Sequence, residues 1–308
     1  MNVIDKVKNK IILAPLAGYT DAGFRKICAD FGCGITVTEM VSAMALKHKN
    51  RKTFQLLKEK ASTKNPLRCV QLFGRDEKVF AEIVKMDEVQ RFDVIDLNMG
   101  CPVPKVVKNG EGSFLMKDTV QAAKVIEATV VNSNKPVSVK FRNGYQENSA
   151  PEFAKICEES GASFLTIHGR LATQMYHGNA DLSCIREAVE NVKIPIFANG
   201  DIKSKEDVDK AIKTTGAAGV AIGRGALGRP WLFEELLEKK VSSDVSLIVQ
   251  EHVEILSEIY SERIVLNEMK KHLAWYFKGM HDAKSAISEL FLAKSVLDLI
   301  KKVKAFCV

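Results

Sequence analysis

The sequence predicts an α/β protein: a (β/α)8 TIM barrel followed by a small all-helical C-terminal domain. Short apolar or β-branched segments recur eight times before residue 223, and helical patterns lie between most of them. Beyond Pro230 the strand signal stops, and apolar residues recur at helical spacing. Eight strand-helix units within about 235 residues suit a barrel, typically about 250 residues long, better than a doubly wound sheet.

Each predicted strand is a short buried segment, and each predicted helix shows apolar residues three or four positions apart. Helices are predicted at 79–84, 119–130, 151–160 and 205–214, and Gly161 and Gly216 follow the last two where glycine commonly ends a helix. The strands are predicted at 11–14, 35–38, 69–72, 94–97, 137–140, 164–167, 196–198 and 219–222.

The C-terminal part is predicted to be a bundle of three or four helices, because apolar residues recur at helical spacing from 246 to 303. Charged residues and serines interrupt this pattern between 236 and 245. We therefore assign residues 1–238 to the barrel domain and residues 239–308 to the helical domain.

Composition excludes several classes of protein. The 308 residues are 46% hydrophobic, enough for one large core and a smaller unit. No apolar run approaches the roughly 18 residues of a membrane helix, and the N-terminal apolar segment is too short for a signal peptide. We expect a cytoplasmic protein without a membrane partner. The seven cysteines form no CxxC pair and show no zinc-ligand spacing, so we predict neither disulfides nor a metal site.

The formal charge of +7 is unevenly distributed along the chain. Residues 270–308 carry eight lysines against three acids, whereas residues 239–269 carry six acids against three basic residues. A solvated helix face explains such runs more often than not, but two basic tracts keep a polyanionic partner in consideration. The first basic tract has one acid, Glu59, among Lys47, Lys49, Arg51, Lys52, Lys58, Lys60, Lys64 and Arg68.

Polar and catalytic residue types follow the predicted strands, where a barrel has its active site. Taken alone, each of these residues is more often structural than functional. It is much less probable that so many of them follow strands by chance. The residues are Pro15 after strand one, Gln71 in or after strand three, Asn98 and Cys101 after strand four, Lys140 at the end of strand five with Arg142 after it, His168 and Arg170 after strand six, Asn199, Gly200 and Asp201 after strand seven, and Gly223 and Arg224 after strand eight.

The loops after strands seven and eight predict a phosphate site. In barrels these loops commonly bind phosphate through backbone N–H groups. Gly223 would let a phosphate approach the backbone closely, and the Arg224 guanidinium could donate two parallel hydrogen bonds to it. This suits a phosphorylated cofactor. No GxGxxG motif follows a strand, so a Rossmann-type NAD site is not supported.

Seven motifs in order carry a resemblance to a known family. The chain resembles the tRNA-dihydrouridine synthases, closest to the bacterial B-type subgroup, over nearly its whole length. EHVEILSEIY and KHLAWYFKGM also resemble that family's C-terminal helical domain. The motifs are APLAGYTD, QLFG, NMGCPVPKVVKNGEGSFLM, VKFRNG, HGRLATQMYHGNAD, ANGD and GRGALGRPWLF.

This resemblance implies an FMN enzyme that uses NADPH to reduce one uridine of tRNA to 5,6-dihydrouridine. The barrel would bind FMN, the helical domain would bind tRNA, and we expect a monomer without an obligate protein partner. The implied FMN-binding residues are Pro15, Leu16 and Ala17 along the flavin, Gln71 at its ring edge, Lys140 and His168 along the ring and ribityl side, and Asn199, Gly200, Asp201, Gly223 and Arg224 around the phosphate.

Cys101 is the candidate acid of this reaction. Hydride transfer to C6 of uracil leaves negative charge across C5 and the C4 carbonyl, and an acid must protonate C5. A thiol with a pKa near 8.5 is mostly protonated at neutral pH and can donate. Lys140 would stabilise an anionic reduced flavin ring. Asn98 would hold the uracil edge, and Arg142 and Arg170 would contact the extruded nucleotide.

Three departures and three alternatives accompany this interpretation. Leu16 stands where the family usually has methionine, Leu171 and Ala172 replace a usual Thr-Arg pair, and Phe114 replaces a small residue.

The first alternative function is that of another FMN barrel: an enzyme acting on a free pyrimidine or an enone would share the phosphate loops. A Schiff-base aldolase would use Lys140 as nucleophile without flavin. An RNA-binding protein without chemistry would not need Cys101, Lys140 and His168 together. The modified uridine position and the preference for NADPH over NADH stay open.

Overall fold

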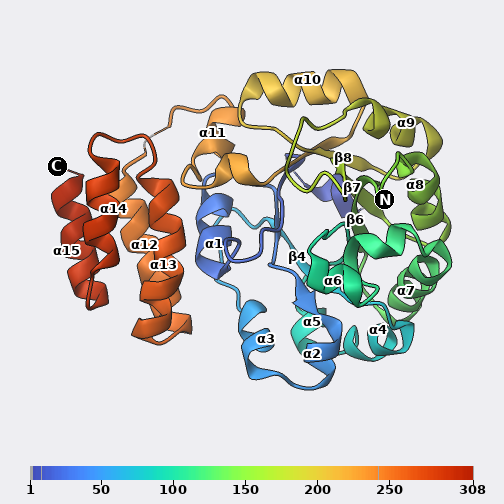
Figure 1. Cartoon of the computed structure of the whole chain (residues 1–308), viewed down its shortest axis with the longest axis horizontal. Coiled ribbons are helices and arrows are strands. Elements are labelled where there is room, and N and C mark those ends of the chain that lie inside the picture. Colours follow the sequence, from blue (N-terminus) through green and yellow to red (C-terminus); the bar gives the residue numbers. More distant parts are fainter. Residues whose placement is uncertain (1–2, 8, 242, 308) are drawn as a thin grey trace.

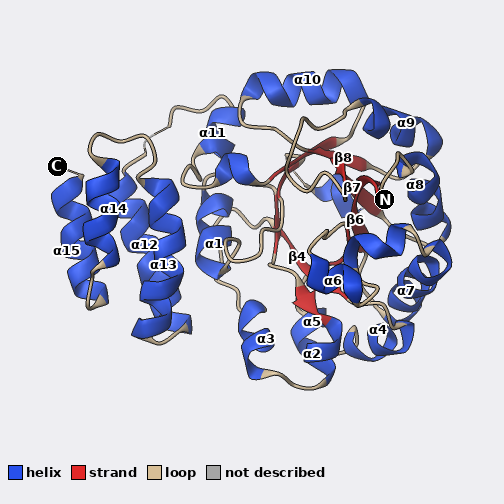
Figure 2. Ribbon diagram, in the orientation of Figure 1, coloured by secondary structure: helices blue, strands red, loops and turns tan. Residues whose placement is uncertain are grey.

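A closed barrel of parallel strands forms the larger part of the molecule, with helices around it (Figures 1 and 2). The structure is a computed structural model and describes residues 3–7, 9–241 and 243–307. Pairing of β2 with β4 closes the sheet, so the predicted (β/α)8 barrel is confirmed. The strands are β1 (Ile11–Leu13), β2 (Ile35–Val37), β3 (Val41–Ser42), β4 (Leu67–Phe73), β5 (Val94–Met99), β6 (Val137–Gly144), β7 (Phe164–Leu171), β8 (Ile196–Asn199) and β9 (Gly219–Ile222).

All eight predicted strands are present, and β3 is an addition that the sequence did not indicate. β3 continues the path of β2 after three irregular residues and pairs with the end of β4. It holds only two residues because Ser42 caps the next helix, accepting a hydrogen bond from the N–H of Ala45. A strand this short leaves no period-two pattern in the sequence.

Alternation along the strands separates the two sides of the barrel wall. On β5, Ile95, Leu97 and Met99 join the large core between the strands and the outer helices. Val94 joins a smaller core in the barrel interior with Phe164 and Phe197. This apolar interior lies toward the N-terminal ends of the strands, and the polar residues lie toward their C-terminal ends.

The outer helices follow the strands in sequence order (Figure 1). Gly216 ends α10 with φ 68°, as predicted, and Gly161 follows α8 with φ 94°. The α-helices are α1 (Ala22–Asp30), α2 (Ala43–Lys47), α3 (Arg51–Leu56), α4 (Glu77–Ile83), α5 (Asp87–Gln90), α6 (Pro104–Lys108), α7 (Thr119–Asn132), α8 (Ala150–Glu159), α9 (Ser183–Asn191), α10 (Lys205–Thr215) and α11 (Leu232–Leu236), with 3₁₀ helices at Val3–Lys6, Gly112–Met116 and Arg224–Ala226.

Four C-terminal helices pack as a bundle beside the barrel (Figure 1). They are α12 (Val245–Ile259), α13 (Glu262–Tyr276), α14 (Ala283–Phe291) and α15 (Val296–Phe306). The bundle has a core of its own, which includes Leu256, Met269 and Leu299. The predicted boundary region lies between α11 and α12, with residue 242 outside the described residues, and the division at residue 238 stays a prediction.

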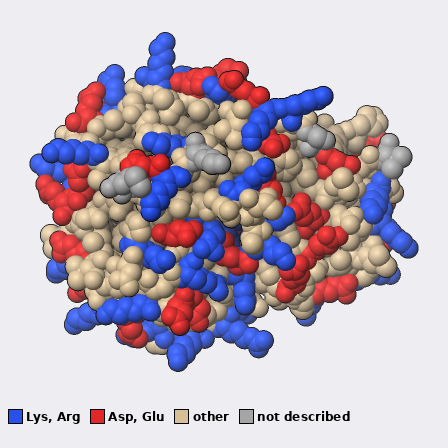
Figure 3. Space-filling view, turned by 180° about the vertical axis from the view of Figure 1, so that it is seen from behind, with Lys and Arg blue, Asp and Glu red and all other residues tan. Residues whose placement is uncertain are grey.

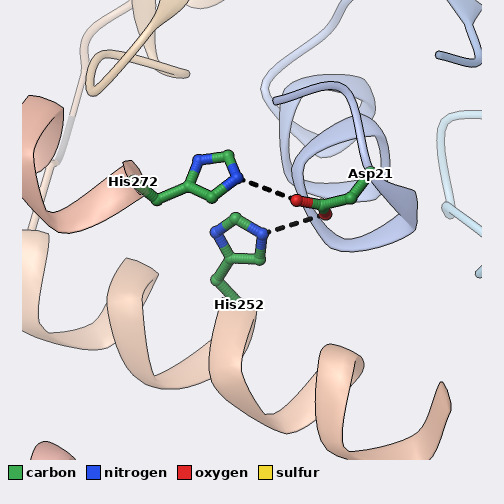
Figure 4. A group of neighbouring side chains, drawn as sticks. All are labelled: Asp21, His252 and His272. Atoms are coloured by element: carbon green, nitrogen blue, oxygen red, sulfur yellow. Dashed lines mark hydrogen bonds and ion pairs between the residues drawn. The ribbon is translucent and has the colours of Figure 1, made fainter. Parts of the chain in front are cut away.

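A buried polar cluster joins the bundle to the barrel (Figure 4). Asp21 caps the N-terminus of α1, and its two carboxylate oxygens lie 3.0 Å from Nε2 of His252 on α12 and 2.8 Å from Nε2 of His272 on α13. Nδ1 of His252 lies 3.2 Å from the hydroxyl of Tyr276. Gly23 permits this approach, because a Cβ there would lie 2.5 Å from the His252 ring. We call Asp21, His252 and His272 the joint cluster.

Charge complementarity also holds α12 against the barrel. Glu251 pairs with Lys26 of α1, and Glu258 pairs with Lys60 in the loop after α3. Part of the uneven charge along the sequence is therefore neutralised inside the molecule. On the face shown in Figure 3, Lys and Arg are interspersed with Asp and Glu. Among the described helices, none is both long and apolar enough to span a membrane.

Candidate active site

A cavity of about 460 Å³ opens at the C-terminal ends of the barrel strands. Its size falls in the usual range for cofactor sites, roughly 300–1,000 Å³. Every site residue predicted from the sequence lines this cavity, although the residues come from seven strands and the loops after them. They are Pro15, Leu16, Ala17, Gln71, Asn98, Cys101, Lys140, Arg142, His168, Arg170, Asn199, Gly200, Asp201, Gly223 and Arg224.

Lys140 lies on the wall of the cavity, and its ammonium group donates to Oδ1 of Asn199 at 3.0 Å. Burial, and to a smaller extent nearby Arg142, lower the pKa of Lys140 to about 8, while Asp96 and Cys101 oppose the change. Lys140 therefore remains largely protonated at neutral pH and presents a positive charge to the cavity.

His168 presents a neutral imidazole to the same cavity. Burial lowers its pKa most, and together with the neighbouring cations Lys140, Arg142, Arg170 and Arg224 it brings the pKa to about 2. Nε2 of His168 lies 3.3 Å from a guanidinium nitrogen of Arg170, which can only donate. Nε2 is therefore the acceptor, and Nδ1 carries the proton.

Cys101 is held in a fixed turn at the mouth of the cavity. Oδ1 of Asn98 accepts the N–H groups of Gly100 at 3.2 Å and Cys101 at 2.9 Å. The carbonyl of Cys101 accepts the N–H of Ser113 at 3.0 Å, and Gly112 (φ 59°) lets that segment pass. A Cβ on Gly112 would lie 2.7 Å from the Cys101 carbonyl oxygen. Burial raises the pKa of the Cys101 thiol, although Arg142 and Lys140 oppose this, so the group stays protonated at neutral pH.

Arg142 and Arg170 are largely buried and hold loops in place. The Arg142 guanidinium donates to the carbonyls of Gly100, Leu171 and Met175 at 2.8–3.1 Å. Arg170 donates to the carbonyls of His177 and Gly178 and to both carboxylate oxygens of Asp201, at 2.7 and 2.8 Å. The structure thus gives both arginines a loop-holding role, and their contact with a nucleotide stays a prediction.

The predicted phosphate side of the cavity combines an exposed cation with an approachable backbone. The Arg224 guanidinium is 47% exposed and lies 5.3 Å from the ring centre of Tyr176. A Cβ on Gly223 would meet only Leu16 side-chain atoms, at 3.6 Å or more, so a ligand can approach this backbone from the cavity. The Asp201 carboxylate accepts hydrogen bonds from Arg170 and from the N–H of Ala180, and a guanidinium nitrogen of Arg224 lies 3.7 Å from its Oδ1. These residues fit a phosphorylated ligand, with Asp201 acting by holding the loop.

Comparison with known proteins adds the family. The family model described as dihydrouridine synthase matches residues 12–306. The chain belongs to this family. A probable tRNA-dihydrouridine synthase of Rickettsia conorii is 40% identical over 98% of this chain and 94% of its own length. The tRNA-dihydrouridine synthase B of Pseudomonas syringae is 35% identical over 90% of this chain and 85% of its own length.

A solved structure of histamine dehydrogenase from Rhizobium sp. 4-9 is similar in fold to this member of the dihydrouridine synthase family. The TM-score is 0.58 at 12% identity, over 80% of this chain and 49% of that one. At that identity the similarity supports the barrel and nothing more. The assignment to the dihydrouridine synthase family therefore rests on the sequence comparisons.

The resemblance predicts that Ala172 replaces an arginine of the dihydrouridine synthase family, and the structure shows where this residue lies. Ala172 is 3% exposed, and its N–H donates to the carbonyl of Gly144 at 2.9 Å. A long cationic side chain could not be added here without moving the loop. Phe114 lies beside Lys117, whose ammonium group is 5.8 Å from its ring centre, and the structure gives no further account of that replacement.

Several lining residues were missed by the sequence analysis. Phe73 lies two residues beyond Gln71, and Asp96, which lies beneath the cavity, is two residues before Asn98, so the period of two along a strand could have indicated both. Met40 and Tyr176 come from irregular segments, for which no periodicity exists. Asp96 accepts hydrogen bonds from residues of two neighbouring strands.

Proposed function

We propose that this chain reduces a uridine of tRNA to 5,6-dihydrouridine, with FMN as the bound hydride carrier and NADPH as the reductant. The observation that carries the proposal is the convergence of Cys101, Lys140, His168 and the Gly223–Arg224 loop on one cavity of a barrel in the dihydrouridine synthase family. The family supports the reaction, and the cavity supports the cofactor.

The cavity offers distinct groups to the two ends of FMN. Arg224 and the open backbone at Gly223 would hold the phosphate. Lys140 would lie beside the ring, with Gln71 at the ring edge and Pro15 to Ala17 along its face. When bound, FMN supplies the hydride that is added to C6 of uracil. The positive charge of Lys140 favours negative charge on a ring beside it.

Cys101 would donate the proton to C5 of the uracil. Its raised pKa keeps the thiol protonated at neutral pH, and the hydrogen bonds to Asn98 and Ser113 fix the backbone that aims it. Proton donation by a positioned acid contributes typically 10²–10⁴-fold. Replacing Cys101 by alanine should therefore lower the single-turnover rate with tRNA by at least about 100-fold, without preventing NADPH from reducing the flavin. The matched control is Cys307→Ala, because Cys307 is exposed, lies at the C-terminal end of α15 and does not line the cavity.

Asn98 retains one donor for the uracil edge. Its carbonyl oxygen accepts two backbone N–H groups, and one amide hydrogen goes to Oε1 of Gln71 at 2.9 Å. The amide nitrogen also lies 4.0 Å from Sδ of Met40, a weak acceptor, and a uracil carbonyl would take the second hydrogen in its place. Because the base must reach the cavity inside the barrel mouth, the nucleotide must leave its stack in the folded tRNA.

The first basic tract is the surface we propose for tRNA. Within the described residues, Lys49, Arg51 and Lys52 form no ion pair, whereas Lys47 pairs with Glu82. This tract runs through α3 next to the bundle, where the hydroxyl of Tyr260 donates to the carbonyl of Gln55 at 3.4 Å. A tRNA on this surface would touch both the barrel and the bundle.

Charge reversal tests this surface. Replacing Lys49, Arg51 and Lys52 by glutamate should weaken tRNA binding and flatten its dependence on salt concentration, because fewer counterions are released. The matched control reverses Lys210 and Lys213 on α10, which lies on the opposite side of the barrel from α3 (Figure 1). Equal effects of the two sets would remove the first basic tract from the proposal.

The decisive experiment for the function is an absorption spectrum, followed by NADPH and then unmodified tRNA. Flavin bands that bleach with NADPH and return with tRNA, with dihydrouridine in the recovered RNA, would establish the reaction. A protein that stays colourless after FMN is supplied would overturn it. Borohydride trapping of a carbonyl substrate on Lys140 would then indicate an aldolase, since a buried lysine with a lowered pKa suits a Schiff base.

A further inference from the structure

Asp96 is a buried carboxylate beneath the cavity. It is 4% exposed and lies on β5 between neighbouring strands, paired in register with Gln71 of β4 and Ser138 of β6. Nε2 of Gln71 and the Ser138 hydroxyl each donate to one of its oxygens at 2.6 Å. A separate cavity beside Asp96 measures only about 10 Å³, room for at most about one water molecule.

A continuous chain of hydrogen bonds leads from Asp96 to the cysteine turn. Gln71 donates to Asp96, its Oε1 accepts from Nδ2 of Asn98 at 2.9 Å, and Oδ1 of Asn98 accepts the N–H of Cys101 at 2.9 Å. An ionised carboxylate can only accept, so Gln71 must turn its NH₂ toward Asp96. Gln71 then offers only oxygen to Asn98, and Asn98 in turn offers only oxygen to the backbone of the turn.

We propose that Asp96 is a positioning residue: its ionised carboxylate sets the direction of every hydrogen bond in this chain and thereby orients Gln71, Asn98 and the turn that carries Cys101. Without a fixed acceptor at Asp96, the Gln71 amide has two orientations of similar energy, and only one of them supports the cysteine turn. This proposal rests on the proposed function, because it gives Asp96 a role in aiming the acid of that reaction.

The charges of Asp96 and Lys140 affect each other's pKa, and this links the chain of hydrogen bonds to Lys140. Burial raises the pKa of Asp96 to about 6, while Ser138, Gln71 and the charge of Lys140 oppose the change. Lys140 on β6 and the Cys69 thiol on β4 are the titratable neighbours of Asp96, and Arg142 and Cys101 are those of Lys140 above it. Protonation of Asp96 adds an O–H donor. Below about pH 6 the hydrogen bonds of the chain therefore no longer have a single possible donor-to-acceptor direction. The charge of Asp96 also helps to keep Lys140 protonated.

Two substitutions at Asp96 separate hydrogen bonding from charge. Asp96→Leu removes both acceptors, and the rate of flavin reoxidation by tRNA in a single turnover should fall about 100-fold, the loss typical of a misplaced catalytic group. Asp96→Asn keeps one acceptor for Gln71, so its loss should stay within about 10-fold at its optimum. Its pH profile should lack the wild-type fall below about pH 6, and its fall above about pH 8 should begin at lower pH.

Ser138→Ala is the matched control, because it breaks the bond to Asp96 on the side away from Gln71. It should leave the cysteine turn intact and shift the acidic limb of the profile to higher pH, since the Ser138 bond lowers the pKa of Asp96. An Asp96→Asn variant that keeps the wild-type acidic limb would overturn the proposal.

Alkylation of Cys101 tests the chain of hydrogen bonds without reductant or tRNA. In a Cys307→Ser background the other described cysteines are buried, so iodoacetamide reports mainly on Cys101 in the protein as purified. Asp96→Leu should alkylate about 10-fold faster and Ser138→Ala at the wild-type rate, because only the former frees the turn. Equal rates in Asp96→Leu and wild type would overturn the proposal. A wild-type protein that makes no dihydrouridine would overturn the proposed function instead, and the alkylation rates would still decide whether Asp96 holds the turn.

Discussion

Among the described residues, Asp96 and Asp21 are buried carboxylates whose pKa values are shifted in opposite directions. Asp96 lies under the cavity, and burial raises its pKa to about 6 against two neutral donors and the charge of Lys140. Asp21 lies in the joint cluster; burial alone would raise its pKa too, but His252 and His272 outweigh burial and hold it well below its usual value. Burial therefore does not fix the sign of a pKa shift, because the partners decide it.

The two surroundings also suit different tasks. Asp21 has three donors, namely two imidazole Nε2 groups and the N–H of Phe24, and it binds together three helices. Asp96 has two donors and lies one hydrogen bond from residues of the cavity. The Asp21 carboxylate is ionised at physiological pH and stabilises the structure, whereas the Asp96 carboxylate can still titrate beside the proposed reaction.

The largest effect in this comparison is expected from Asp21→Ala. It should lower the free energy of unfolding by about 3–5 kcal/mol, because two buried imidazole donors and one backbone N–H lose their acceptor together. Unfolding in guanidinium chloride measures this loss. Asp76→Ala is the matched control, since Asp76 also caps a helix, α4, but contacts no histidine. It should cost about 1 kcal/mol. Equal losses for the two variants would show that the histidines contribute nothing.

A smaller and pH-dependent effect is expected from Asp96→Asn. A folded-state pKa of about 6 against 3.8 means that the folded protein binds this proton more tightly, so wild-type stability falls as pH rises from about 4 to 6. The asparagine variant lacks this dependence. Its stability relative to wild type should increase by about 3 kcal/mol between pH 4 and pH 7. At Asp21 the sign is reversed, because a lowered pKa gives stability that is present above about pH 4 and is lost below it. A constant difference for Asp96→Asn would contradict the raised pKa.

No effect is expected from metal removal. Asp21, His252 and His272 place their ligand atoms within 4.8 Å of one another, so they could in principle hold a metal ion. However, the two imidazoles reach different oxygens of Asp21 at 3.0 and 2.8 Å, which are hydrogen-bond distances. Incubation with a strong chelator should leave the Tm unchanged, and metal analysis of the purified protein should find no stoichiometric zinc. A Tm that falls with chelator and returns with zinc would make the joint cluster a metal site.

Much of the barrel could be predicted because its signals are local. Strands such as 164–167 and 219–222 are continuous apolar segments bounded by turns, and Gly216 marks a helix end by a conformation that other residues rarely adopt. The cavity residues could be predicted because a parallel barrel brings every strand's C-terminal end to the same face. Phe73 and Asp96 were missed although they share the period of their strands with Gln71 and Asn98.

Sequence patterns alone were enough to predict eight of the strands in order, the face on which the functional residues gather, and the family. Which polar groups become partners depends on the tertiary structure. His252 and His272 meet Asp21 from 231 and 251 residues away, and the acids of α12 meet the cations of the barrel. Periodicity acts over a few residues, whereas these contacts depend on how the bundle docks. The same reason applies to Asp96: only the register of β4, β5 and β6 places Gln71 and Ser138 beside it, and its pKa results from burial opposed by these two donors.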